Sequence, residues 1–221
     1  MSDFPPSDLP SFPDSTEPGA GEFLDIWDDS TQEESVLPPM DVDIMDEIPR
    51  EIGYSEELSE FWHYQGDTQD CALYSQGGVL EADGQLFDVV KYEQQGIEGG
   101  WYVPGEGTYM DHFGDLLEEN GAAVTRYESA TIQDMANELD RGHGVVVAVD
   151  CLPIWGEPGG HALWITGIEV GSNGTPTSVI CNDSGREDGQ QIAYPYEAFK
   201  LAWDSYGDTI VATKDQLSAL S

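Results

Sequence analysis

The sequence predicts an α+β protein in which a helical half precedes an antiparallel sheet. Between residues 71 and 142, apolar residues recur at helical spacing between capping residues and glycines. Residues 144–214, in contrast, contain short runs rich in β-branched residues. Helices and strands do not alternate regularly, which favours an antiparallel sheet over a parallel sheet built from βαβ units.

An acidic, proline-rich segment precedes this region. Residues 1–55 contain eight of the thirteen prolines and fifteen acidic residues, with Arg50 as their only basic residue. A chain of this composition buries too little apolar surface to offset the entropy lost on ordering. We therefore predict a disordered tail over residues 1–55 and one folded domain over residues 56–221.

Capping residues and spacing define the helices of the first half. A helix is expected to begin at Cys71, and its two adjacent glycines indicate that another part of the chain packs closely there. Thr108 and Thr131 are expected N-caps of two later helices. The predicted helices cover residues 71–82, 86–96, 107–121 and 131–142.

Strand signals dominate the second half. The runs are rich in valine, isoleucine and threonine and are bounded by glycine, asparagine or aspartate. One helix, over residues 196–206, interrupts them. The predicted strands cover residues 122–128, 144–151, 161–170, 177–183 and 208–214.

The charge of the chain excludes several classes of partner. It has 44 acidic residues against 7 lysines and arginines, a formal net charge of −37 at pH 7. Phosphate binding needs clustered Lys and Arg, so we expect binding neither to nucleic acid nor to anionic membranes. A basic peptide or protein would be attracted, although adaptation of a whole proteome to salt explains the same charge.

The sequence contains no signal for export or for insertion into a membrane. No run of about eighteen apolar residues occurs, and the N-terminus lacks the basic and apolar regions of a signal peptide. We therefore expect a cytoplasmic protein, with export by a signal-independent route left open. Cys71, Cys151 and Cys181 form no C-x-x-C pair, so we expect no disulfide framework, no metal site and no other cofactor.

Four residues occur in an order that suits cysteine catalysis. Cys71 begins a predicted helix, where the positive end of the helix dipole favours a thiolate. His161 begins a predicted strand after two glycines, and Asp183 ends the next strand, so the imidazole and the carboxylate could meet. Gln65, six residues before Cys71, could donate a side-chain N–H to an oxyanion.

Each of these residues also has a purely structural explanation. A cysteine near a helix start is commonly a small buried residue, and an Asn-Asp pair after a strand is commonly a turn. Asn182 competes with Asp183 for the role of orienting the imidazole, because strand alternation directs only one of the two inward. Gln69, two residues before Cys71, is a second glutamine near the cysteine in the sequence. Only the combination of all four residues forms one coherent set.

The sequence resembles the papain-like cysteine peptidases related to the bacteriocin-processing (double-glycine) peptidases. The resemblance extends over about residues 60–213 and is specific in three segments, "QGDTQDCA", "GGHALWITGIEV" and "VICNDSG…YPYEAFKLAW". It implies a papain-like fold, in which a helical lobe carrying the cysteine packs on an antiparallel sheet carrying histidine and aspartate. It also implies roles for four residues: Cys71 as nucleophile, His161 as base, Asp183 as its orienting residue and Gln65 in the oxyanion hole.

The sequence departs from the family at two positions beside these residues. Ala72 follows the cysteine where the family often has glycine, and Ser184 follows the Asn-Asp pair where the family often has proline. We expect a cysteine peptidase that acts on a peptide or protein. Two alternatives remain open: a non-catalytic papain-like module that binds a protein partner, and a transglutaminase-like acyl transferase.

Overall fold

A computed structural model describes residues 50–221 of the chain. The predicted disordered tail lies outside the described residues as far as residue 49. Its last part differs from the prediction, because Arg50–Gly53 form strand β1, which pairs antiparallel with strand β6 (Gly160–Val170). Composition could not reveal this strand, since it is four residues long and its partner lies more than a hundred residues further along the chain.

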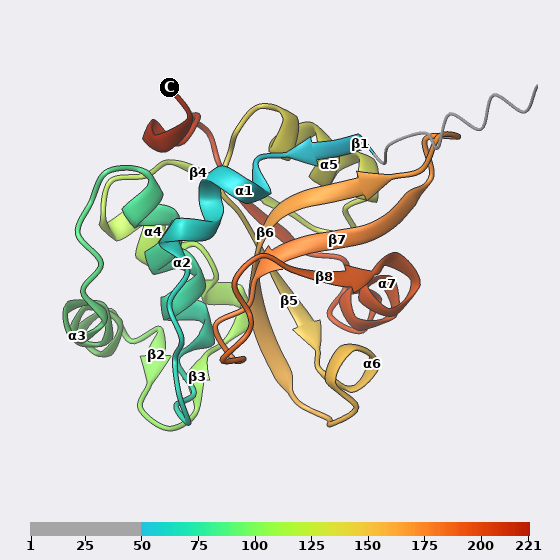
Figure 1. The fold of residues 1–221 in the computed structure, drawn as a ribbon. Coiled ribbons are helices and arrows are strands. Elements are labelled where there is room, and N and C mark those ends of the chain that lie inside the picture. The colour runs from blue at the N-terminus through green and yellow to red at the C-terminus, as the bar shows by residue number, and fades with distance from the viewer. Residues whose placement is uncertain (1–49) are drawn as a thin grey trace, which may run out of the picture. The chain divides into compact units, whose positions relative to one another are not determined.

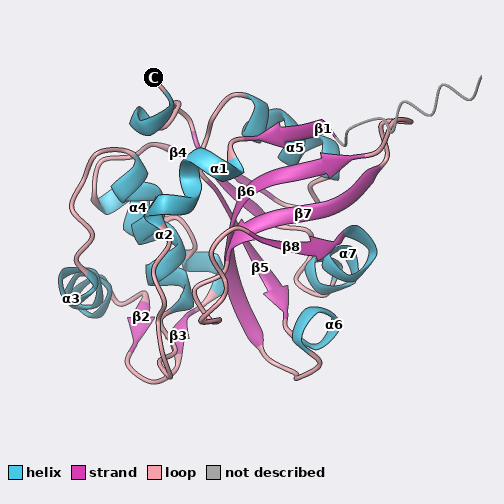
Figure 2. Ribbon diagram, in the orientation of Figure 1, coloured by secondary structure: helices cyan, strands magenta, loops and turns pink. Residues whose placement is uncertain are grey.

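The predicted α+β architecture is confirmed (Figures 1 and 2). The main sheet has the strand order β4-β9-β5-β6-β7-β8, with β1 beside the far part of β6, and all of its pairings are antiparallel. Its remaining strands are β4 (Val124–Tyr127), β5 (Val145–Asp150), β7 (Pro176–Asn182), β8 (Ile192–Pro195) and β9 (Ile210–Thr213).

Most of the predicted helices form, at nearly the predicted positions. Thr131 caps α5 through a reciprocal capping box with Asp134, and Asp88 accepts a hydrogen bond from the main chain at the start of α3. The helices are α1 (Ser55–Leu58), α2 (Cys71–Ala82), α3 (Val89–Gly99), α4 (Asp115–Glu119), α5 (Ile132–Asp140), α6 (Leu152–Trp155) and α7 (Tyr196–Asp204).

The continuous helix predicted over residues 107–121 is wrong. Thr108 does not cap a helix but lies in β3 (Gly107–Thr108), which pairs with β2 (Tyr102–Val103). Gly114 has a φ of 99°, a left-handed conformation that interrupts a helix, and its N–H donates to Oε1 of Gln76 at 3.0 Å. Within this range, Met110–His112 form one 3-10 turn, and Asp115–Glu119, after Gly114, form the α-helix α4.

Two apolar cores lie on opposite faces of the sheet. Alternate residues of β5 and β6 divide between them, because successive side chains of a strand point to opposite faces. Val146, Ala148 and Trp164 join the core beneath α2, α3 and α4, whereas Val147 and Leu163 join the core beneath α5 and α7. The site described below lies at one end of this central pair of strands.

Helix α2 lies very close to strand β6. A Cβ atom added to Gly78 would lie 2.8 Å from the indole ring of Trp164 and 2.9 Å from the carbonyl oxygen of Phe61. The Ser75 hydroxyl donates to the carbonyl oxygen of Ala162 at 3.1 Å. The adjacent glycines therefore permit the close approach that the sequence indicates.

Among residues 50–221, no helix is long and apolar enough to cross a membrane.

We predict that Gly78→Ala destabilises the protein even though alanine is the better helix former. The propensity gain is about 1 kcal/mol, whereas overpacking against Trp164 and the Phe61 carbonyl costs about 1–3 kcal/mol, and the helix backbone cannot shift without moving Cys71. Urea unfolding would measure the change. Gly159→Ala is the control, because nothing lies within 4 Å of its added Cβ; equal unfolding free energies for the two variants would contradict the prediction.

Candidate active site

Cys71 is the first residue of α2 and remains partly exposed. As the first residue of the helix, it has a main-chain N–H that lacks an acceptor within the helix. The thiol therefore lies beside free N–H groups at the positive end of the helix dipole. This placement agrees with the position expected for a nucleophilic cysteine.

His161 lies at the start of β6 and is almost entirely buried, with 5% of its surface exposed. Its Nε2 atom lies 2.7 Å from Oδ1 of Asp183. The indole of Trp155 packs against the imidazole with the ring centroids 4.6 Å apart. Because Nε2 is engaged by the carboxylate, Nδ1 is the nitrogen left for Cys71, which lines the same two cavities as His161.

Strand alternation separates Asn182 from Asp183. The side chain of Asn182 points to the opposite face, where its amide donates to the carbonyl oxygen of Leu58 and its oxygen accepts from the N–H of Gln191. Asp183 lies on the same face as Cys181, and its carboxylate meets His161. The structure therefore brings Asp183 to the imidazole, and not Asn182.

The carboxylate of Asp183 is fully buried and accepts hydrogen bonds on both oxygens. Besides His161, Oδ1 accepts from the N–H of Gly185 at 2.9 Å. Oδ2 accepts from the Tyr194 hydroxyl at 2.6 Å and from the Trp155 indole N–H at 3.2 Å. Burial alone would raise the pKa of Asp183, but the hydrogen bonds and the charge of His161 hold this pKa below its usual value.

The imidazole of His161 is stabilised in its protonated form. Burial alone would lower its pKa, but the hydrogen bond to Asp183 and the interaction with Cys71 outweigh burial and raise the pKa to about 9. The protonated imidazole therefore lies between the Asp183 carboxylate and Cys71.

Gln65 lines the same cavity as Cys71 and His161 and is held there by hydrogen bonds. Its side-chain N–H donates to the carbonyl oxygen of Thr68 at 2.7 Å, and its Oε1 accepts from the Ser184 hydroxyl at 2.7 Å. Its main-chain N–H donates to the carbonyl oxygen of Ser184 at 2.9 Å.

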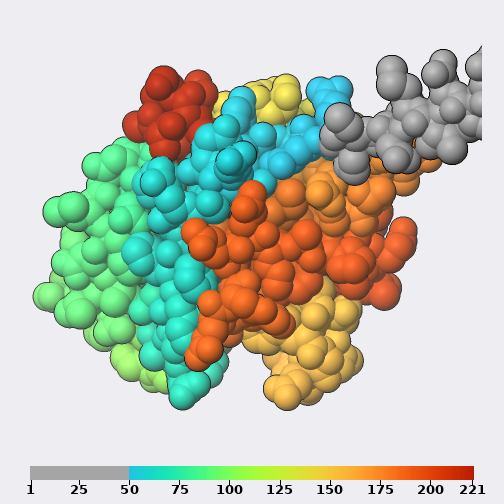
Figure 3. Space-filling model, viewed as in Figure 1, coloured from blue at the N-terminus to red at the C-terminus, as the bar shows by residue number. Residues whose placement is uncertain are grey.

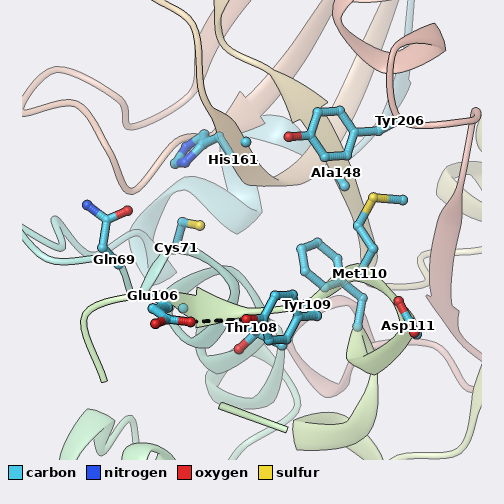
Figure 4. Close-up of a pocket in the computed structure, with 13 residues that line it drawn as sticks. Gln69, Cys71, Glu106, Thr108, Tyr109, Met110, Asp111, Ala148, His161 and Tyr206 are labelled. Atoms are coloured by element: carbon cyan, nitrogen blue, oxygen red, sulfur yellow. Dashed lines mark hydrogen bonds between the residues drawn. The ribbon is translucent and has the colours of Figure 1, made fainter. Parts of the chain in front are cut away.

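Two cavities meet at Cys71 and His161. One, of about 480 Å³, extends past Met110, Ala148 and Tyr206 (Figure 4). The other, of about 470 Å³, lies between residues 65–69 and residues 155–160, and the space-filling view shows a notch between these two segments (Figure 3). A chain lying across both cavities would pass directly over the thiol.

The thiols of Cys151 and Cys181 both have a raised pKa. Burial, followed by the nearby charge of Asp183, raises the pKa of Cys151 to about 12. The same two causes raise the pKa of Cys181 well above its usual value. Both remain protonated at neutral pH, so neither is a candidate nucleophile.

Sequence reasoning missed three residues of the site. Trp155 and Tyr194 bind Oδ2 of Asp183, and Ser184 binds the Gln65 amide. We did not predict the short helix that carries Trp155 or the edge strand that carries Tyr194, and we noted Ser184 only as a departure from the family. Of the aromatic residues in the glycine-rich segment before α4, Tyr109 lines the first cavity, whereas Trp101 and Tyr102 are buried in the core.

Within residues 50–221, no three His, Cys, Asp or Glu side chains gather as ligands for a metal.

We predict that the imidazole of His161 stays protonated until the pH rises through about 9. In Asp183→Asn the carboxylate is lost and burial is opposed only by Cys71, so the pKa should fall toward or below the usual value of about 6.5. The raised pKa stabilises the fold fully below pH 6.5, and this contribution is lost as the pH approaches 9. NMR titration of the ring would measure both forms; titration of His161 near pH 6.5 in the unmodified protein would contradict the assignment.

Part of the chain is similar in sequence to mycobacterial proteins. The chain is 30% identical over 129 residues to uncharacterized proteins of Mycobacterium bovis (Mb1299c) and Mycobacterium tuberculosis (Rv1268c). These matches cover 49% of this chain and 54% of each relative, so the chain spans about half the length of the curated relatives it matches.

Solved structures show the same fold. A protein of Bacillus anthracis described as a C39-like peptidase superposes with a TM-score of 0.56 at 14% identity, covering 76% of this chain and all of that one. The peptidase domain of Streptococcus ComA, a bifunctional ABC transporter of a quorum-sensing pathway, gives a TM-score of 0.52 at 17% identity, covering 70% of this chain and 98% of the domain.

A family model settles the relationship that the three sequence segments suggest. The model described as the Peptidase_C39 like family matches residues 61–211, which include Gln65, Cys71, His161 and Asp183 and extend over more than half of the chain. The protein therefore belongs to the Peptidase_C39-like family.

Proposed function

We propose that this protein is a cysteine peptidase that hydrolyses peptide bonds through Cys71, His161 and Asp183, with Gln65 as an oxyanion donor. One observation carries the proposal: the His161 ring contacts the Asp183 carboxylate through Nε2 and has its other nitrogen left for Cys71. Membership of a peptidase family supports the reaction class.

The reaction would follow from the charges of these groups. The Cys71 thiolate attacks the carbonyl carbon, and the carbonyl oxygen gains negative charge near the Gln65 amide and the free N–H of Cys71. The C–N bond then breaks as imidazolium His161 gives its proton to the leaving amine. Water, deprotonated by neutral His161, attacks the resulting thioester; the thiolate leaves, the acid is released and the thiolate–imidazolium pair is restored.

Asp183 would keep His161 in the required form throughout. Its Oδ1 fixes the orientation of the ring, and the Tyr194 hydroxyl and the Trp155 indole occupy Oδ2. Burial and the adjacent carboxylate raise the pKa of Tyr194, so its hydroxyl stays protonated and remains a donor. The carboxylate is thus held as an anion that favours the imidazolium without taking its proton.

The substrate is proposed to be a peptide or protein segment with basic side chains near the cleaved bond. Glu106 and Asp111 line the first cavity, whereas Asp67 and Glu157 line the second. Neither lining contains a lysine or arginine, and none of the four carboxylates forms a salt bridge with another described residue. Carboxylates that have no basic side chain as an ion-pair partner, in both cavities beside the thiol, favour a cationic chain over an anionic one.

We expect His161→Ala to lower peptide hydrolysis by at least about a hundredfold, because it removes both the proton donor and the base. His112→Ala, which removes a partly exposed histidine that lines neither cavity, is the matched control. In the same variants, mass spectrometry should show iodoacetamide labelling of Cys71 that depends on His161, while Cys151 and Cys181 stay unlabelled. Undiminished hydrolysis in His161→Ala would remove this residue from the mechanism.

The same assay separates the two alternative functions. Binding of peptides without any hydrolysis, together with labelling of Cys71 that does not depend on His161, would favour a non-catalytic module. Product that forms only when an amine is added would favour an acyl transferase. Either result would replace the peptidase proposal.

We expect Glu106→Gln with Asp111→Asn to weaken the preference for basic peptides. Peptides that carry one lysine or one norleucine, at each of three positions on either side of the bond, would be compared by kcat/KM. Loss of two weak, exposed ion pairs should lower the preference for lysine by about threefold to tenfold. Glu56→Gln with Glu57→Gln on α1 makes the same change in net charge outside both linings; an equal loss of preference there would show that only the overall charge matters.

A further inference from the structure

We infer that Ser184 is a positioning residue that fixes the Gln65 amide for the oxyanion, an inference that rests on the proposed peptidase function. Ser184 is buried, with 3% of its surface exposed, and does not line either cavity. Its Oγ hydroxyl donates to Oε1 of Gln65 at 2.7 Å. It therefore acts on the substrate only through Gln65.

The two ends of the Gln65 amide are held by different partners. The Thr68 carbonyl oxygen can only accept, so it selects the NH₂ end, while the Ser184 hydroxyl holds the oxygen end. With both ends held, the plane of the amide is fixed. One N–H is used by Thr68, and the second N–H is the one available to a developing oxyanion in the cavity that Gln65 shares with Cys71.

The position of Ser184 in the chain connects the two halves of the site. The preceding residue, Asp183, holds His161, and Ser184 holds Gln65, so consecutive side chains serve the base and the oxyanion donor. The serine hydroxyl supplies a contact that a residue without a side-chain donor could not make.

The main chain would keep its arrangement without the hydroxyl. The N–H of Gln65 donates to the carbonyl oxygen of Ser184, and the N–H of Asp183 donates to the carbonyl oxygen of Gly189. Neither bond involves the serine side chain. Ser184→Ala therefore removes the anchor of the amide and leaves the segment and the contact between Asp183 and His161 in place.

A double-mutant cycle between Ser184 and Gln65 tests the inference in the full-length protein. Ser184→Ala should lower kcat by about twofold to tenfold, the range for one lost neutral hydrogen bond, and leave KM unchanged. In a Gln65→Ala background, the same substitution should cause no further loss, because no amide is left to orient. Ser184→Thr, which keeps a hydroxyl, should restore most of the activity.

Ser75→Ala is the matched control. It also removes a buried serine hydroxyl near the site, but one that binds the Ala162 carbonyl and not Gln65. Ser75→Ala should change kcat by the same factor in the unmodified protein and in the Gln65→Ala variant. If Ser184→Ala also lowers kcat equally in both backgrounds, the role is structural and the inference is overturned.

A second readout does not require turnover. Acetyl-Ala-Ala-alaninal forms a C–S bond with Cys71, and its carbonyl oxygen becomes the oxygen of a tetrahedral adduct, whereas iodoacetamide alkylates the thiol without creating such an oxygen. Ser184→Ala should weaken aldehyde binding by about twofold to tenfold and leave the iodoacetamide rate unchanged. Unchanged aldehyde binding would overturn the inference. A protein that binds the aldehyde in this way but hydrolyses no peptide would contradict the peptidase proposal alone.

Discussion

The close packing of α2 on β6 determines the geometry of the whole site. Cys71 begins the helix and His161 begins the strand, so their separation is set by how near these two elements come. Gly78 leaves room for the Trp164 ring, and the Ser75 hydroxyl binds the main chain one residue from His161. The pair is thereby positioned by the rigid core, and not by flexible loops.

A second constraint is the cost of burying charge. The Asp183 carboxylate has no exposed surface, and such an anion is tolerated only where its oxygens are occupied by donors and a cation lies beside it. His161, Gly185, Tyr194 and Trp155 meet this requirement together. His161 and Trp155 lie more than twenty residues before Asp183, and Tyr194 lies on the following strand, so the site depends on completion of the sheet.

Local sequence signals were enough to predict the features that depend on neighbouring residues. The start of α2 at Cys71, the capping of α5 by Thr131 and the strand that follows two glycines at His161 are all short-range features. Spacing could not decide between Asn182 and Asp183, because that choice depends on which of the two side chains lies on the face of the sheet that His161 occupies. The partners of Asp183, the break at Gly114 and strand β1 also depend on long-range contacts, which a single sequence does not display.

Strand β1 has a consequence for how the chain can be shortened. Beyond Ile165, the edge of β6 that β5 leaves uncovered is paired with Arg50–Gly53. A chain trimmed to the composition boundary at residue 56 would expose the main-chain N–H and C=O groups of residues 167–170 along an otherwise apolar strand. An open edge of this kind recruits strands from other molecules. The four residues that composition groups with the acidic tail thus complete the main-chain pairing of this part of β6.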